Sequence, residues 1–250
     1  MRAKAFFLVF IFLSFFSSLF GQSAEELIAQ ADQLYAEMKD MAAAQEVMKI
    51  YQDALLKAEN KYEAYWRMAR IHYYIGSHTD SNKDKKVIFS QGIYYAKKAI
   101  ALAADKPDGY YWLGVNYGVY GEARGVLKSL FLVDDIKEAM NKVVELNRAY
   151  EDGGPDRVLG RVYFKLPGFA GGDMKKSLEH LLKSKEFGPN DSLTRCYLAD
   201  TYIELKEYSK AKEELEFVLN MESDPRWVSG VEESKVIAKE MLQKKEFRKG

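Results

Sequence analysis

The chain has 250 residues, of which 48% are hydrophobic and 14% aromatic, with 37 basic and 37 acidic residues. So large an apolar fraction excludes a disordered chain, and only five prolines among many leucine, alanine, lysine and glutamate residues favour a helical globular protein over a β-sandwich. The balanced charge creates no global field that would attract nucleic acid or an acidic membrane, so no nucleic-acid partner is predicted.

The N-terminus has the pattern of an export signal. Arg2 and Lys4 precede a run of 17 uncharged residues, "AFFLVFIFLSFFSSLFG", which ends at Gly21. A basic start, an apolar stretch and a small-residue end are typical of secretory signal peptides. We therefore predict that residues 1–21 are removed and that residues 22–250 form a periplasmic or secreted domain. The alternative is an N-terminal membrane anchor, for which 17 residues are short.

From Ala24 onward the apolar residues recur at helical spacing, and no stretch alternates as a strand would. Residues 24–39 and 42–59 are predicted to form the first two helices. The polar segment from Gly76 to Lys86 and the segment "KLPGFAGGD" (residues 165–173) are predicted to be loops. The prolines fall at the predicted helix ends or within these loops, because proline cannot continue a helix.

A repeated pattern organises the helices. The segments "YYWLGVNY", "DRVLGRVY" and "RCYLADTY" each carry leucine, a small residue and then tyrosine three positions on, and "YWRMARIH" is a degenerate copy. A second helix with a small residue and apolar residues follows each one. This arrangement resembles the tetratricopeptide repeat, in which the small residue lets the second helix cross closely. We predict an all-α, right-handed superhelix of four degenerate tetratricopeptide-like helix pairs between terminal capping helices.

Four glycines punctuate the first helix of the second repeat. Gly114, Gly118, Gly121 and Gly125 are spaced four, three and four residues apart, so they share one helical face. A phosphate-binding glycine loop would need a preceding strand and a different spacing. We therefore interpret the glycine face as a groove against which the following segment, "VLKSLFLVDD", packs.

A narrower resemblance rests on the secretory start together with "YYWLGVNYGVYGEARG", "GGPDRVLGRVYFKLPGFAGGD" and "KKSLEHLLKSKEFGPN". Over about residues 60–222 the chain resembles the T-component of tripartite periplasmic (TRAP-type) transporters. That resemblance implies a periplasmic helper that associates with a solute-binding protein and offers a cleft to a small hydrophobic or anionic ligand. The chain departs from it in lacking a lipid-bearing cysteine after the apolar run.

Two further interpretations stay open. Similar loops and repeats occur in eukaryotic regulators of microtubule dynamics, which rank second here because the N-terminus has the pattern of an export signal. A general envelope protein of the tetratricopeptide class, acting in protein interaction or assembly, is the alternative to a transporter component.

Catalytic patterns are missing from the sequence. The three histidines have no metal-ligand spacing, and no nucleophile or zinc-protease motif occurs. Cys196, the only cysteine, lies in an apolar helical pattern that predicts a buried structural thiol, and His72 is predicted to lie in the core or the groove wall. We therefore predict a non-enzymatic protein without a cofactor or a metal.

The binding surface is predicted from the repeats, because the first helix of each pair lines the concave face of a tetratricopeptide array. Arg157, Arg161 and Lys165 succeed one another by one helical turn, so their charges can converge on a carboxylate while aromatic rings pack on an organic body. The alternative is a solvated, charged helix face. The expected partners are a protein and a small organic anion, and homo-oligomerisation is left open. The predicted ligand-binding residues are Trp66, Arg70, Tyr73, Tyr74, Tyr111, Arg157, Arg161, Phe164 and Lys165.

Overall fold

The computed structural model describes residues 21–222, 228–244 and 247, so the predicted signal peptide lies outside the described residues except for Gly21. The described part contains α-helices and two short 3-10 segments and no strand, as predicted. None of its helices combines the length and the apolar character needed to cross a bilayer. The elements are α2 (Ala24–Glu37), α3 (Met41–Lys57), α4 (Tyr62–Ser77), α5 (Asn82–Leu102), α6 (Pro107–Arg124), η1 (Val126–Leu132), α7 (Val133–Asn147), α8 (Tyr150–Lys165), η2 (Gly168–Ala170), α9 (Met174–Phe187), α10 (Ser192–Glu204), α11 (Tyr208–Leu219) and α12 (Val228–Leu242).

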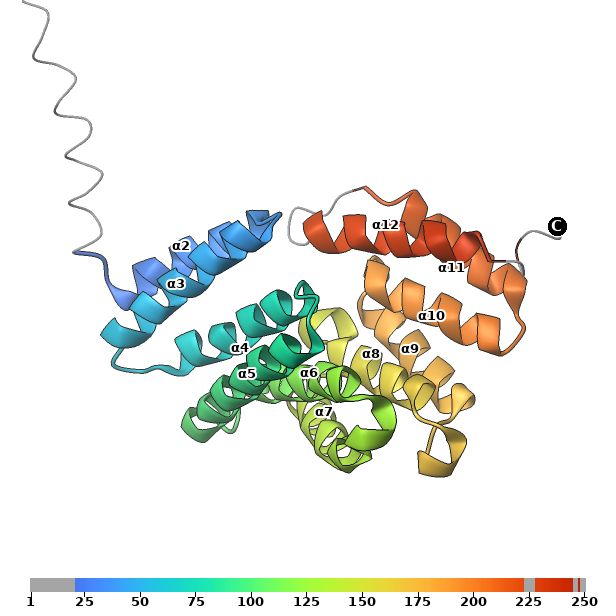
Figure 1. Cartoon of the computed structure of the whole chain (residues 1–250), viewed down its shortest axis with the longest axis horizontal. Coiled ribbons are helices and arrows are strands. Elements are labelled where there is room, and N and C mark those ends of the chain that lie inside the picture. Colours follow the sequence, from blue (N-terminus) through green and yellow to red (C-terminus); the bar gives the residue numbers. More distant parts are fainter. Residues whose placement is uncertain (1–20, 223–227, 245–246, 248–250) are drawn as a thin grey trace, which may run out of the picture.

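Consecutive helices pack in pairs, α2 with α3 through α10 with α11, and α12 packs on the last pair. The pairs follow one another in an arc (Figure 1), with α2–α3 and α12 at its two ends. Three groups of buried residues form the core: one across α2 to α5, one across α4 to α8 and one across α9 to α12. The predicted all-α superhelix of helix pairs is therefore confirmed.

The small residues of the repeat pattern lie where the paired helices cross. A Cβ atom added at Gly160 in α8 would come within 2.6 Å of Leu181 Cγ in α9. The corresponding Ala69 and Ala199 are fully buried. Because no larger side chain fits at these crossings, the pattern read from the sequence is a packing requirement.

The four glycines of α6 do not share one role, which corrects the sequence interpretation. A Cβ at Gly114 would clash with Met140 of α7, and one at Gly121 would press on Ser129, whose hydroxyl donates a hydrogen bond to the Gly121 carbonyl at 3.0 Å. These two glycines accept neighbouring segments as predicted. Gly125, at φ 92°, ends α6, and Gly118 faces open space.

The predicted loop from Gly76 to Lys86 is also shorter than expected. Helix α4 runs through Ser77 and α5 begins at Asn82, so only residues 78–81 are non-helical. The reason is local: the Ser81 hydroxyl accepts a hydrogen bond from the Asp84 N–H, which caps α5 at its N-terminus. The second predicted loop, residues 165–173, does connect two helices, α8 and α9, and its last residue, Asp173, caps α9.

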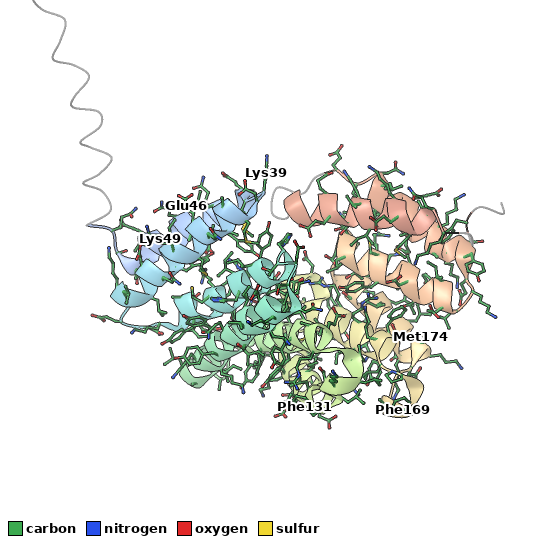
Figure 2. The ribbon with its side chains drawn as sticks, in the orientation of Figure 1. Lys39, Glu46, Lys49, Phe131, Phe169 and Met174 are labelled. Atoms are coloured by element: carbon green, nitrogen blue, oxygen red, sulfur yellow. The ribbon has the colours of Figure 1, made fainter. Side chains whose placement is uncertain are left out.

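Apolar side chains are also exposed away from the concave side. Phe131, next to the end of η1, is 64% exposed, and Phe169 in η2 is 82% exposed. Figure 2 shows both at the lower edge of the molecule, opposite the ends of the arc formed by α2–α3 and α12.

A cavity enclosed by the first helices of the pairs

A cavity of about 510 Å³ lies on the concave side of the arc. Its volume is in the range of sites that hold small organic molecules or a few side chains, about 300–1,000 Å³. It is lined mainly by the first helices of the successive pairs and by α12, with further residues from η1, the start of α7 and the end of α9. The aromatic residues of its wall are Tyr35, Tyr73, Tyr74, Tyr111, Trp112, Phe187 and Tyr197.

The structure brings six of the nine predicted site residues to this cavity: Tyr73, Tyr74, Tyr111, Arg157, Arg161 and Lys165. Trp66, Arg70 and Phe164 are not among the residues that line it. Arg70 is held by side chains of α2, Asp32 and Tyr35, whereas Trp66 belongs to the core group of α4 to α8.

Arg70 is held inside the protein by α2 and α3. Its Nη2 donates to Asp32 Oδ1 at 2.7 Å and to Tyr51 Oη at 2.8 Å, and its guanidinium stacks on the ring of Tyr35 at 3.9 Å. Trp66 is a core residue whose Nε1 donates to a glutamate on the same helix. Arg70 Nη2 and Trp66 Nε1 thus have acceptors within the protein, and both residues are buried outside the cavity wall, with Arg70 Nε left without a partner.

The predicted cations of the third repeat are paired with carboxylates. Arg157 Nη1 lies 2.9 Å from Asp191 Oδ2, and its Nη2 donates to Tyr111 Oη at 2.8 Å. Arg161 Nη1 lies 2.9 Å from Asp200 Oδ2, and Lys165 Nζ lies 3.5 Å from Glu122 Oε1. The guanidinium of Arg161 also stacks between Tyr197 and Phe164, which explains why Phe164 supports the wall rather than forming it.

The cavity is consequently not the basic groove that the sequence predicted. Its lining contains three basic residues, Arg157, Arg161 and Lys165, against five acidic ones. The pattern within one helix does not reveal that each cation meets a carboxylate from a neighbouring element. The acidic residues are Glu122, Glu151, Asp152, Asp191 and Glu233.

Glu151 was missed by the sequence analysis, and the backbone at the start of α8 places it. Glu151 (φ 51°, ψ 47°) and Asp152 (φ 56°, ψ 45°) adopt left-handed conformations, followed by Gly153 at φ 79°. Left-handed geometry costs about 1–2 kcal/mol per non-glycine residue. The turn is wedged in position because a Cβ at Gly153 would meet the Ser184 carbonyl at 2.7 Å, and one at Gly154 would meet the Tyr111 ring at 2.6 Å. The sequence "EDGGPD" carried this signal, since glycines before a helix-starting proline mark a sharp turn.

The Glu151 carboxylate makes no hydrogen bond and no ion pair with any residue that the structure describes; only its backbone carbonyl accepts one, from Arg157. Burial raises the pKa of this carboxyl group above its usual value, and Arg70 and Arg157 offset part of that effect through their charge. It is an unpaired acid in the wall of a cavity.

Hydrogen-bond donors in the wall also lack partners. The Trp112 side chain is 5% exposed, and its Nε1–H has no acceptor. The hydroxyl groups of Tyr35 and Tyr197 make no hydrogen bond within the described ranges, and burial raises the pKa of both phenols, which keeps them protonated. The Tyr35 and Tyr197 hydroxyl groups can therefore donate hydrogen bonds to a group inside the cavity, whereas the Trp112 Nε1–H is itself buried.

A contact between α4 and α12 closes one side of the cavity. His78 Nε2, at the C-terminal end of α4, lies 2.9 Å from Glu233 Oε1 in α12, and the imidazole ring stacks on Tyr74 at 4.1 Å. The hydrogen bond to Glu233 raises the pKa of His78 above its usual value. Sequence reasoning treated α12 as a cap and did not place it beside the first repeat.

The remaining residues singled out from the sequence are structural. Cys196 is 2% exposed, and burial raises the pKa of its thiol to about 12, so the thiolate needed for nucleophilic chemistry is disfavoured. His72 is buried with Nδ1 2.6 Å from the Met68 carbonyl oxygen, and burial lowers its pKa. His72 therefore occupies the core, one of the two places predicted for it.

Comparison with solved structures identifies the fold. The chain is similar to TTC0263, a thermophilic tetratricopeptide-repeat protein of Thermus thermophilus, with a TM-score of 0.66 and 16% identity. The match covers 88% of this chain and 100% of that structure. The fold is therefore tetratricopeptide-like.

Comparison with curated proteins identifies relatives. The chain is 30% identical to regulator of microtubule dynamics protein 1 of Mus musculus over 125 residues, which are 49% of this chain and 39% of the mouse protein. It is 28% identical to the protein of the same name from Bos taurus over 125 residues, 37% of that protein. The chain thus spans less than half the length of these two relatives.

The family that the sequence analysis ranked second is the one whose model matches. The match covers residues 27–154, from α2 to the left-handed turn that carries Glu151, and this is about half of the chain. The chain therefore belongs to the family of regulator of microtubule dynamics proteins 1-3.

Proposed function

We propose that this protein is a binding scaffold that holds a segment of a partner protein in the cavity between its first helices and α12. The observation that carries the proposal is the wall itself: aromatic residues line a cavity of about 510 Å³, and the hydroxyl groups of two of them, Tyr35 and Tyr197, make no hydrogen bond within the described residues. Such donors suit peptide carbonyl groups, which an extended segment presents at regular intervals.

Two classes of partner follow from different observations. The names of the mouse and bovine relatives support a partner that belongs to, or acts on, a cytoskeletal filament. The N-terminal export pattern supports a partner outside the cytoplasm, such as the solute-binding protein of a TRAP-type transporter, which stays a prediction from the sequence. The cavity does not depend on this choice, because it is built from the repeats.

A small organic molecule is the second candidate occupant. The volume of the cavity and its largely apolar wall, which includes Val115, Val158 and Ile136, are compatible with a compact ligand. A partner segment is preferred because the wall extends over the first helix of every pair and so forms an elongated surface.

Gly118 gives a sharp test. It lines the cavity, and a Cβ atom at this position would meet no other atom within 4 Å. Gly118→Leu should therefore fill part of the cavity without disturbing the fold, whereas Gly118→Ala should leave most of the space open. A random twelve-residue peptide library displayed on phage would be selected on the purified wild-type protein.

Selected peptides should bind the wild-type protein and Gly118→Ala with similar affinity, and Gly118→Leu at least about tenfold more weakly. Fluorescence of Trp112 in the wall reports binding directly. Peptides that bind all three proteins equally would place the binding surface elsewhere and refute the proposal.

A further inference from the structure

We infer that Glu151 recognises a cationic side chain, lysine or arginine, on the segment that enters the cavity. This inference rests on the proposed function and specifies the chemistry of the partner. The inference is drawn from the ion pairs of the cavity wall, which include every charged side chain with a known partner but not Glu151.

The other charged residues of the wall already interact with partners inside the protein. Each cation of the wall has a carboxylate within 3.5 Å, and the one histidine among them meets a glutamate. Asp152 also has an interaction within the protein. Glu151 remains as the carboxylate of the wall without a hydrogen bond or an ion pair in the described part of the chain. The pairs are Arg157–Asp191, Arg161–Asp200, Lys165–Glu122 and His78–Glu233.

The two arginines whose charge reaches Glu151 cannot serve as its partners. Arg70 is held by Asp32 and Tyr51, and Arg157 is held by Asp191 and Tyr111. Arg70 Nη2 and both Nη groups of Arg157 therefore already have acceptors, and neither guanidinium pairs with Glu151, although Arg70 Nε has no acceptor within the described residues. A carboxylate removed from water is normally paired, since its desolvation is not otherwise recovered. An incoming cation would supply the missing charge.

The surroundings of Glu151 also suit a cation on an organic stem. Tyr35 and Tyr111 line the same cavity, and the charge of Glu151 acts on the hydroxyl groups of both. Aromatic rings attract ammonium and guanidinium groups, as the stacking of Arg70 on Tyr35 shows here, and their apolar surface packs on the methylene stems of lysine and arginine. An anionic side chain would be repelled by Glu151 and would find the arginines engaged.

A metal ion is a weaker explanation for the same carboxylate. Hard cations require several oxygen ligands. In the part of the chain that the structure describes, no group of three histidine, cysteine, aspartate or glutamate residues could hold one. A side chain needs only the single charge that Glu151 provides.

The experiment extends the peptide selection to Glu151→Gln, which keeps the size of the side chain and removes its charge. Peptides selected on the wild-type protein should be enriched in lysine and arginine relative to the starting library, and those selected on Glu151→Gln should not. A wild-type-selected peptide should bind Glu151→Gln about tenfold or more weakly, because a charge-assisted hydrogen bond is lost.

The same test can be made from the peptide, which does not depend on how the variant folds. Replacing the selected lysine by methionine should weaken binding to the wild-type protein by the same factor and have little further effect on Glu151→Gln. Glu122→Gln is the matched control, since Glu122 also lines the cavity but pairs with Lys165, and the basic preference should survive it.

The outcomes separate this inference from the proposed function. Peptides that are excluded by Gly118→Leu but show no basic preference, or keep it on Glu151→Gln, would overturn the role of Glu151 and leave the scaffold standing. Peptides indifferent to Gly118→Leu would overturn both.

Discussion

Arg157 in α8 donates a hydrogen bond to Tyr111 Oη in α6 at 2.8 Å while it pairs with Asp191, the N-cap of α10, at 2.9 Å. One guanidinium thus ties together the first helices of three successive pairs. A residue that the sequence assigned to ligand binding therefore also joins three repeats, so its removal should affect stability.

Loss of Arg157 should destabilise the protein more than loss of the other two cations. The Arg157 side chain is 12% exposed and that of Asp191 is 20% exposed, so Arg157→Ala leaves a mostly buried carboxylate without its counter-charge, although Asp191 keeps its N-cap hydrogen bond from the Thr194 N–H. We expect a loss of about 2–4 kcal/mol in the free energy of unfolding. Lys165→Ala should cost about 0–1 kcal/mol, since this pair is half-exposed. Urea unfolding measures both.

The loss of unfolding free energy for Arg161→Ala should lie between those for Arg157→Ala and Lys165→Ala. The sequence alone predicts lost binding without a change in melting temperature, but the Arg161–Asp200 pair, with side chains 22% and 25% exposed, predicts a measurable loss of stability as well. Equal unfolding free energies for the three alanine variants would contradict this ranking by burial.

The glycines offer a test of opposite signs. Gly118→Ala should stabilise the protein by about 0.8–1.0 kcal/mol, because alanine is the better helix residue and nothing lies within reach of the new methyl group. Gly160→Ala should destabilise it by about 1–3 kcal/mol, because the methyl group would be driven into Leu181 and the Ser177 carbonyl. Thermal unfolding of both variants and of the wild-type protein measures these changes in stability. A stabilised Gly160→Ala would mean that α8 and α9 are not tightly packed.

The contact between His78 and Glu233 should depend on pH. Because the pKa of His78 is raised in the folded protein, its stabilisation is fully present below the unfolded value of about 6.5 and is lost as the pH rises through the folded value. Both side chains are partly exposed, so the effect should stay within about 1 kcal/mol.

A comparison of His78→Gln with the wild-type protein at pH 5.5 and 8.5 isolates this contribution. The variant should lose stability at the lower pH and match the wild-type protein at the higher one. A difference of the same size at both values would show that the imidazole contributes by packing on Tyr74 rather than through its charge.

The N-terminal prediction needs a separate measurement. Mass spectrometry of the protein recovered from cells should find a mature chain that begins at Gln22, outside the cytoplasm. Recovery of the intact chain in the membrane fraction would support the anchor instead.

The sequence by itself determined the helix pairs and their crossing points. Helical periodicity, capping residues and prolines act within a few residues of one another, so local spacing was enough to place the helices, apart from the overlong loop at residues 76–86. The small residues Ala69, Gly114, Gly160 and Ala199 were recognisable for the same reason: each crossing is made between adjacent helices of one repeat.

The tertiary structure alone decided which charges remain unpaired. Asp191 and Asp200 reach Arg157 and Arg161 from the next repeat, and Asp32 reaches Arg70 from the preceding pair. Such pairs depend on the rotation between successive repeats, which arises from side-chain packing along the whole array and leaves no periodic signal in the sequence. The same rotation carries α12 to His78, and it leaves Glu151 facing the cavity without a counter-charge of its own.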